Sequence, residues 1–155
     1  MPTIAENKKA LFDYQILEKI EAGIKLTGPE VKVVRAGQID LKGAYVLIKA
    51  RPGSNSPEAW LTGSHIPKYK KAGYSQSGYN PDRDRKLLLN KGEIAQLIGK
   101  TKQKSLTLIP LSVYTAGRLI KVGLGLGQGK KKFDKRETIK KREFDRKKQF
   151  LIKRG

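Results

Sequence analysis

The pattern of apolar and polar positions predicts a domain built mainly from short β-strands. Apolar residues alternate with polar ones from Ala10 to Ile16, which is typical of a half-buried strand. Ile20, Ile24 and Leu26 follow, with Gly23 between them, so we expect one long first strand with a bulge near Leu17 or at Gly23. Residues 1–9 lack such a pattern and are predicted to be a flexible arm.

Later segments repeat the strand pattern and are separated by turn residues. Strands are expected at residues 44–50, 58–63, 105–114 and 118–126. Residues 51–57 hold two Pro and a Gly and predict a loop, and residues 115–117 predict a short turn. Residues 64–85 are polar and contain Gly and Pro, so they predict a long loop.

Two segments carry the signals that begin a helix. Thr27 and Glu30 have the spacing of a capping box, in which the side chain of each residue accepts a hydrogen bond from the backbone amide of the other. Gly37 is placed to end that helix. Asn90 and Glu93 repeat the same arrangement before a second short helix, which we expect to close at Gly99.

Alternate glycines mark the last expected strand, at positions 123, 125, 127 and 129. A strand face without side chains lets another chain approach closely, either neighbouring protein inside a curved barrel or an RNA backbone. About six strands and two to three short helices indicate a mainly β protein, with an OB-like antiparallel barrel.

The C-terminal segment is strongly basic. Of the 27 residues from 129 to 155, 13 are Lys or Arg and 4 are Asp or Glu. Its residue types allow a helix from Asp134 to Arg154, about 30 Å long. It has no continuous apolar face, so we expect a tail that is disordered when free and helical on a polyanion. The alternative is a solvated tail that only aids solubility. We therefore predict a body at 1–128 and a tail at 129–155.

Charge also narrows the class of partner. The whole chain has a formal net charge of +20, and the body alone holds 21 basic and 10 acidic residues. Basic charge on both parts favours nucleic acid over a small acidic substrate. No apolar run approaches the length of a membrane span, no secretory signal is visible, and the chain has no cysteine, which suits a cytoplasmic protein.

Residues that could carry catalysis are few. His65 is the only histidine, and no Cys/His cluster fits a metal site. Asp82 and Asp84 lie beside Arg83 and Arg85, where ion pairing is expected rather than acid–base work. We therefore expect a protein that is not an enzyme and that needs no metal or cofactor.

Six stretches stand in a specific order along the chain. They are NKKA at 7–10, EAGI at 21–24, GPEVK at 28–32, DRDRKLLLN at 82–90, TLIPL at 107–111 and GKKKFDKR at 129–136. Together they resemble the family of small protein B, the SsrA-binding proteins of bacterial trans-translation. The resemblance covers about residues 7–154.

The resemblance implies an adaptor for ribosome rescue. Its body would bind the tRNA-like domain of transfer-messenger RNA and bring that RNA to the A site of a stalled ribosome, with elongation factor Tu as a further partner. Its tail would lie at the 16S rRNA decoding centre and in the empty mRNA channel, where it becomes helical. The implied protein is a cytoplasmic monomer that catalyses no covalent step.

The resemblance also assigns RNA-contacting positions in the body. Asn7 and Asn90 would bond base edges or 2′-hydroxyls, and Glu21 would accept from a base amine or a 2′-hydroxyl unless it forms a surface ion pair. Leu88 would pack on an unstacked base or sugar unless it belongs to the barrel core. Phosphate contacts would come from the basic neighbours Lys8, Lys9, Lys25, Arg85 and Lys86.

Tail residues are assigned to the ribosome in the same way. Phe133 holds the position that stacks on a decoding-centre base, in place of a more usual His or Tyr. The other implied tail contacts are Lys130, Lys131, Asp134, Lys135, Arg136 and the distal apolar pair Leu151 and Ile152. Val33-Val34 also departs from the family pattern, and the 51–57 loop is longer than usual.

Two other classes of function fit the basic composition. A ribosomal or generic structured-RNA-binding protein would hold its tail permanently in RNA. A metal-dependent nuclease on an OB-like barrel would need a cluster of acidic residues, which the sequence does not display.

Overall fold

A curved antiparallel sheet forms the centre of the molecule in the computed structural model, which describes residues 2–70, 76–104, 106–130, 136 and 139–146. Its strands are β1 (Thr3–Glu6), β2 (Tyr14–Ile24), β3 (Tyr45–Ala50), β4 (Pro57–Thr62), β5 (Arg85–Leu88), β6 (Thr107–Ala116) and β7 (Leu119–Gly129). The helices that accompany the sheet are α1 (Lys8–Asp13), α2 (Gly28–Arg35) and α3 (Lys91–Lys104). Residues 139–146 are helical as well.

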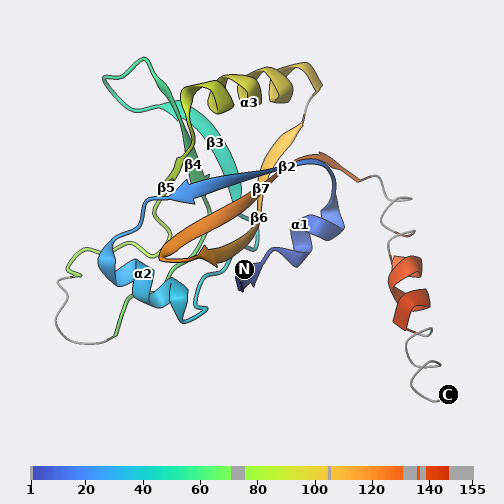
Figure 1. Ribbon diagram of the computed structural model, residues 1–155, viewed down its shortest axis with the longest axis horizontal. Helices are drawn as coiled ribbons and strands as arrows, with labels where there is room; N and C mark the ends of the chain where they lie inside the picture. Colours follow the sequence, from blue (N-terminus) through green and yellow to red (C-terminus); the bar gives the residue numbers. More distant parts are fainter. Residues whose placement is uncertain (1, 71–75, 105, 131–135, 137–138, 147–155) are drawn as a thin grey trace.

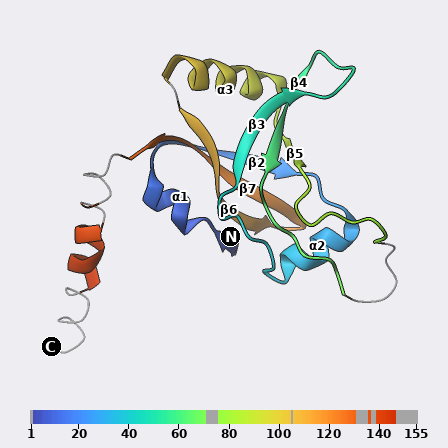
Figure 2. The same ribbon diagram turned by 180° about the vertical axis from the view of Figure 1, so that it is seen from behind.

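The sheet has the order β1-β6-β7-β2-β5-β4-β3, and every pair is antiparallel. β3 also lies beside β6 across the core, so the sheet curls toward a barrel. In the described residues the hydrogen-bonded order remains open between β1 and β3. Figures 1 and 2 show α3 and α2 at opposite ends of the curved sheet, with α1 beside β6 and β7. The prediction of a mainly β, barrel-like fold is confirmed, and the described residues form seven strands in place of about six.

The core lies on the inner side of this curved sheet. Val34 of α2, Leu61 of β4 and Leu124 of β7 have no exposed surface and belong to one cluster. Burial of each such side chain contributes roughly 1.5–3 kcal/mol. A second cluster on the other side of the sheet joins Ala10 of α1 to Ile109 and Leu111 of β6. The strands therefore bury apolar residues on both faces where α1 covers them.

The glycines of β7 make room for that second cluster. A Cβ atom at Gly125 would lie 2.8 Å from Leu111 Cδ1 and 3.2 Å from Ile16 Cγ2. A Cβ atom at Gly127 would lie 3.2 Å from Ile16 Cδ1. Of the two explanations for the glycine face, close packing of protein side chains therefore accounts for these two positions. Nothing lies within 4 Å of a Cβ built on Gly129.

The prediction of a flexible arm at residues 1–9 is wrong. Residues 3–6 form β1, which pairs with β6, and Thr115 N donates to Pro2 O at 3.1 Å. Ile4 and Ala5 pack against the main core cluster. This strand depends on a partner more than 100 residues later in the chain, so no local pattern could predict it.

The predicted first strand begins too early. Residues 8–13 form α1, because Asn7 caps the helix by accepting from Ala10 N through its side chain at 3.2 Å. Strand β2 then starts at Tyr14, and its register shifts between Ile16 and Glu18. The bulge thus lies near Leu17, the first of the two predicted sites.

Helix α2 confirms the first capping prediction. Thr27 N donates to Glu30 Oε1 at 2.9 Å, and Glu30 N donates to Thr27 Oγ1 at 3.4 Å. Gly37 follows the helix with a φ of 84°, a conformation that favours glycine.

The second helix begins as predicted but ends later. Asn90 and Glu93 bond reciprocally at 3.1 and 2.7 Å. Gly99, the expected end, remains helical, and α3 runs on to Lys104. Thr101 lies in this continuation, and its hydroxyl donates to Leu97 O at 2.9 Å.

Candidate nucleic-acid interface

One exposed face of β5, β2, β7 and β6 holds two of the predicted RNA contacts. Leu88 lies opposite Gly23, and Gly23 lies opposite Lys121. Lys121 in turn lies opposite Tyr114 in β6. Glu21 precedes Gly23 by two residues in β2, so it shares this face. The sheet therefore brings Glu21 and Leu88 together, although they are distant in sequence.

Glu21 is held in place by its neighbours. The Tyr114 hydroxyl donates to Glu21 Oε2, and Lys121 Nζ lies 3.8 Å from Glu21 Oε1. Burial, followed by the hydrogen bond and the charge of Glu21, raises the pKa of Tyr114 to about 12. The ion pair considered from the sequence is present, but the Glu21 side chain remains 50% exposed. RNA contact by Glu21 remains a prediction.

Leu88 is a surface residue and does not belong to the core. It is 53% exposed, which contradicts the alternative that it fills the barrel. The absence of a side chain at Gly23 makes room for it, because a Cβ there would lie 3.2 Å from Leu88 Cβ. Leu88 borders a groove of about 740 Å³ between β5 and α3, which Ile94 and Ile98 also line. Apolar contact with an unstacked base or sugar is therefore sterically available.

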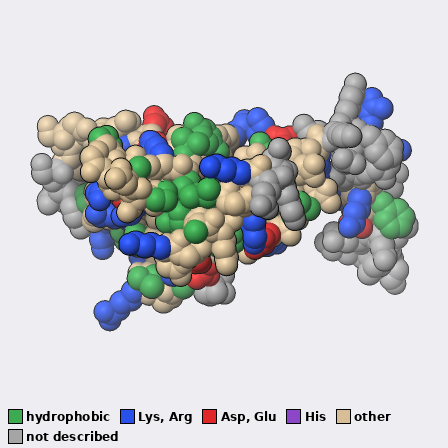
Figure 3. Space-filling model, turned by 90° about the horizontal axis from the view of Figure 1, so that it is seen from above, with side chains coloured by type: hydrophobic (Ala, Val, Ile, Leu, Met, Phe, Trp, Pro, Cys, Tyr) green, Lys and Arg blue, Asp and Glu red, His purple; other side chains and the backbone are tan. Residues whose placement is uncertain are grey.

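The predicted phosphate contacts differ in exposure. Lys8, Lys9 and Lys25 are exposed. Lys86 is half-buried, and its Nζ lies 3.5 Å from Glu58 Oε2 at the rim of the same groove. Figure 3 looks onto the α3 side of the molecule and shows Lys and Arg side chains around hydrophobic ones. Such a mixed surface suits RNA, whose phosphates need cations and whose unstacked bases need apolar contact.

Arg85 is the clearest correction to the predicted site. Its side chain has no exposed surface, so phosphate cannot reach it. Its Nε donates to Glu30 Oε2 at 2.7 Å, and its Nη2 donates to Tyr79 Oη at 3.1 Å and to Pro81 O at 2.9 Å. Its Nη1 donates to Ser64 Oγ at 3.1 Å. Arg85 thus fastens the long loop before β5 to helix α2.

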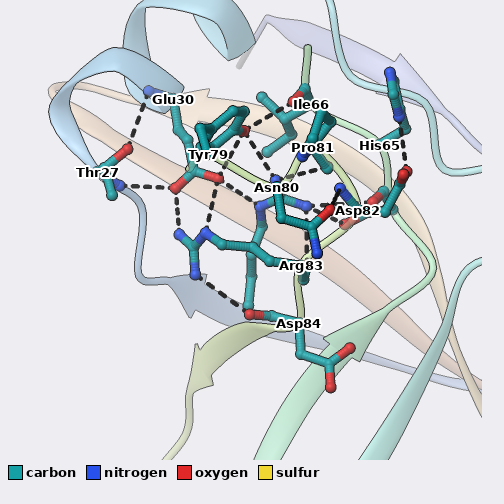
Figure 4. Close-up of polar contacts among 12 residues, drawn as sticks. Thr27, Glu30, His65, Ile66, Tyr79, Asn80, Pro81, Asp82, Arg83 and Asp84 are labelled. Carbon is teal, nitrogen blue, oxygen red and sulfur yellow. Dashed lines mark hydrogen bonds and ion pairs between the residues drawn. The ribbon is translucent and has the colours of Figure 1, made fainter. Parts of the chain in front are cut away.

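Glu30 is the acidic centre of this buried network, which Figure 4 shows. It accepts hydrogen bonds from Arg83, Arg85 and Tyr79 as well as from the Thr27 backbone. Burial alone would raise the pKa of Glu30, but the bonds from Arg83, the Thr27 amide and Arg85 outweigh it and lower the pKa to about 2. Burial and the charge of Glu30 raise the pKa of Tyr79.

The predicted role of Asn7 in RNA binding is also wrong. Asn7 is 4% exposed, and both ends of its amide are in use. Its Oδ1 accepts from Ala10 N, and its Nδ2 donates to Pro110 O at 2.9 Å. Asn90 is different because it is exposed, although its Oδ1 caps α3. Contact between Asn90 and RNA remains a prediction.

The start of the tail is attached to α1. Lys130 N donates to Asp13 O at 2.8 Å, and the Arg142 guanidinium carbon lies 5.6 Å from the centre of the Phe12 ring. Figure 1 accordingly shows the helical residues 139–146 on the α1 side of the molecule. Arg136 is exposed and helical. The remaining predicted tail contacts lie outside the described residues: Lys131, Phe133, Asp134, Lys135, Leu151 and Ile152.

The side chains considered for catalysis contact other side chains. His65 Nδ1 lies 2.7 Å from Asp82 Oδ1, and Lys49 Nζ lies 3.1 Å from Asp84 Oδ2. Within the described part of the chain, no group of three or more His, Cys, Asp or Glu side chains could hold a metal ion. No helix among the described residues is both long and apolar enough to cross a membrane.

A barrel-like sheet with an exposed face of mixed basic, acidic and apolar residues defines a small basic β-protein of the RNA-binding class. Comparison with known proteins specifies this class further. The model of a protein family described as "SmpB protein" matches residues 4–154. An "SsrA-binding protein" of Gloeothece citriformis is 49% identical over 151 residues, which cover 97% of this chain and 93% of the relative.

Two further similarities agree with that match. An "SsrA-binding protein" of Cupriavidus pinatubonensis is 49% identical over 156 residues, covering 99% of this chain and 97% of the relative. A solved structure described as "tmRNA-SmpB: a journey to the center of the bacterial ribosome" aligns with a TM-score of 0.63 and 44% identity. That alignment covers 85% of this chain and 87% of the other. The chain belongs to the SmpB protein family.

Proposed function

We propose that this protein binds the tRNA-like domain of transfer-messenger RNA and delivers that RNA to stalled ribosomes for trans-translation. The observation that carries the proposal is the family match, which spans both the folded body and the basic tail. The relatives named SsrA-binding proteins and the tmRNA-SmpB ribosome structure support the same partners.

The body supplies the RNA contacts in this proposal. Glu21, Leu88 and Asn90 are exposed, and Glu21 and Leu88 share one face of the sheet. Exposed lysines, among them Lys8, Lys9 and Lys25, supply phosphate contacts. Arg85 and Asn7 act indirectly, by holding the loop before β5 and the start of α1.

The tail supplies the contacts to the decoding centre and the mRNA channel. Ile139 is 43% exposed and Phe144 is 65% exposed, so apolar side chains of the tail helix are free to contact rRNA. We keep the division after residue 128 as a proposal, and β7 extends one residue beyond it, to Gly129. Elongation factor Tu joins the delivered complex, and the protein acts as a cytoplasmic monomer.

The protein works as an adaptor and catalyses no covalent step. It places the RNA, and the ribosome performs the transfer of the nascent chain. The ribosomal-protein alternative predicts stable presence on all ribosomes after high-salt washing. The nuclease alternative predicts magnesium-dependent RNA cleavage that is lost when one acidic residue is removed.

A truncation tests the division of labour. Gly129 pairs with Tyr14, and Lys130 N bonds Asp13 O, so the chain is ended after Lys130 to keep the body intact. We expect the truncated protein to retain affinity for the tRNA-like domain and to lose tagging of nascent chains on stalled ribosomes. Glu21→Gln, by contrast, should weaken binding to the tRNA-like domain itself. Loss of RNA affinity in the truncated protein would contradict the division.

A further inference from the structure

Helix α1 carries two large apolar side chains that neither core cluster includes. Ala10 is the residue of α1 that packs inward, in one cluster with Ile109 and Leu111 of β6. Leu11 and Phe12 follow it in the chain and are members of neither cluster. Leu11 is 38% exposed, and Phe12 is partly exposed. Successive residues of a helix point about 100° apart, so these two side chains turn away from the direction of Ala10. Helix α1 therefore keeps an apolar surface at the edge of the body.

The tail begins at the C-terminal end of this helix. Gly129, the last residue of β7, pairs with Tyr14. Lys130 N donates to Asp13 O at 2.8 Å, and Lys130 Nζ donates to Leu11 O at 3.4 Å. The last carbonyl groups of a helix lack partners within it, and the negative end of the helix dipole favours a cation there. The last turn of α1 has no basic residue of its own. Lys130 supplies that cation and fixes the point at which the tail leaves the body.

Further along the chain, the tail returns to the same helix. The Arg142 guanidinium carbon lies 5.6 Å from the centre of the Phe12 ring, within the roughly 6 Å over which a cation and an aromatic ring attract each other. Arg142 belongs to the helical residues 139–146. Figures 1 and 2 show these residues on the α1 side of the molecule. A helix this short is marginal in water without packing, so its contact with α1 helps to hold it.

Charge limits the strength of this attachment. The tail from 129 to 155 has 13 basic and 4 acidic residues, and the body is basic as well. Like charges on the two parts repel each other, so short-range contacts have to hold the tail against that repulsion. A polyanion such as rRNA instead attracts both parts, and it competes with α1 for the tail. The attachment is therefore suited to release when the tail meets RNA.

We propose that α1 is a docking site for the protein's own tail helix, and that docking holds the tail on the body until the ribosome displaces it. The inference rests on the proposed binding of the tail to rRNA. Phe12 and the C-terminal end of α1 form the docking surface, and Lys130 and Arg142 are the two points of attachment. Phe12 stays on the body, whereas a tail in the mRNA channel extends away from it. The docked fraction therefore lowers the apparent affinity of the tail for rRNA.

A spin label on the tail tests docking in the protein without RNA. The chain has no cysteine, so Glu143→Cys gives a single labelling site beside Arg142. We expect the label to broaden the amide NMR signals of α1. Arg142→Gln should lower the ratio of docked to undocked protein about 2- to 5-fold, as expected for an exposed cation–π contact, and reduce the broadening. Arg146→Gln is the matched control, because it removes the same charge from the same helix and leaves the Phe12 contact in place.

A substitution on the body tests the same contact from the other side. Phe12→Leu keeps an apolar side chain, and it should reduce the broadening as Arg142→Gln does. Adding Arg142→Gln to Phe12→Leu should then change the broadening little, because the contact is already absent. Arg142 and Arg146 are exposed residues of the tail, so their replacement leaves the body folded. Docking is overturned if the labelled protein shows no broadening of α1, or if both arginine substitutions reduce it equally.

Binding of an RNA oligonucleotide with the sequence of the 16S decoding centre tests the holding role. Phe12→Leu should strengthen binding of the full chain to this RNA about 2- to 5-fold, because more of the tail is undocked. Its affinity for the tRNA-like domain should stay unchanged. Unchanged affinity for the decoding-centre RNA, together with reduced broadening, would overturn the holding role while the proposed function stands. If the wild-type protein does not prefer the decoding-centre RNA to an unrelated hairpin, the proposed function of the tail is overturned, whereas the spin label still decides whether the tail docks.

Discussion

Replacement of Glu30 by Gln should destabilise the folded body, because it removes the acidic centre of the network around Arg85. The pKa of Glu30 is lowered from 4.5 to about 2. At about 1.4 kcal/mol per pKa unit, the folded state stabilises the ionised form by about 3 kcal/mol. Glu30 is 1% exposed, so solvent screens little of this electrostatic stabilisation. The substitution would also leave the Arg85 charge buried without its partner. Breaking a buried ion pair in this way typically destabilises the folded state by about 3–5 kcal/mol.

The dependence of the folded state's stability on pH follows from the direction in which the pKa of Glu30 changes on folding. A carboxyl group whose pKa is lower in the folded state contributes its full stability above its unfolded pKa of 4.5. That contribution is lost as the pH falls from 4.5 toward 2. Urea denaturation should therefore show Glu30→Gln about 3 kcal/mol less stable than wild type at pH 7. The difference should narrow as the pH approaches 2, because wild-type Glu30 then becomes protonated.

Glu93→Gln is the matched control for this prediction. Glu93 occupies the same position of a capping box in α3 and accepts from Asn90 N at 3.1 Å. In the described part of the chain it has no arginine partner. We expect its replacement to change the free energy of unfolding by less than about 0.5 kcal/mol. Equal stability of Glu30→Gln and wild type at pH 7, or a difference that persists at pH 2, would refute the reasoning.

Four further substitutions, with Leu47→Ala as a control, test packing, stability and the RNA-binding face. Gly125→Ala places a methyl group 2.8 Å from a leucine of β6 and should cost about 1–3 kcal/mol in urea denaturation. Gly99→Ala has open space in α3 and should instead add about 0.5–1 kcal/mol. Leu88→Ala should weaken RNA binding roughly tenfold without loss of stability. Leu47→Ala, at an exposed leucine of β3, should leave RNA binding unchanged. Asn7→Ala should lower stability by about 2 kcal/mol through its cap and its bond to β6, and leave RNA preference intact.

Local signals predicted much of the fold. The capping boxes at Thr27 and Asn90 depend on residues three positions apart, and both helices begin where the sequence indicates. The β3–β4 hairpin and the β6–β7 hairpin follow from neighbouring strand patterns. The alternation at residues 10–16 was misleading, because the Asn7 cap and long-range packing of Ala10 on β6 favour a short helix over an extended strand.

The candidate site was predicted less completely, because basic residues look alike in a sequence. Arg85 stands among charged neighbours and resembles a surface residue. The signal that identifies it is the alternation in β5, which places Arg85 and Leu87 on the same inward face. Its partner Glu30 was recognised as a cap, but its contacts with residues about 55 positions away depend on the fold. Tyr114 likewise meets Glu21 only through strand pairing.

The central claim is that the body recognises the tRNA-like domain itself and does not merely attract RNA through charge. A salt titration tests it most directly, with the full chain and with the chain ended after Lys130, against the tRNA-like domain and an unrelated hairpin. Phosphate contacts should make every affinity fall with salt. We predict that both proteins still prefer the tRNA-like domain at about 150 mM salt, where non-specific binding is weak. If both RNAs follow one curve, the protein is a general binder of RNA, and the account is contradicted.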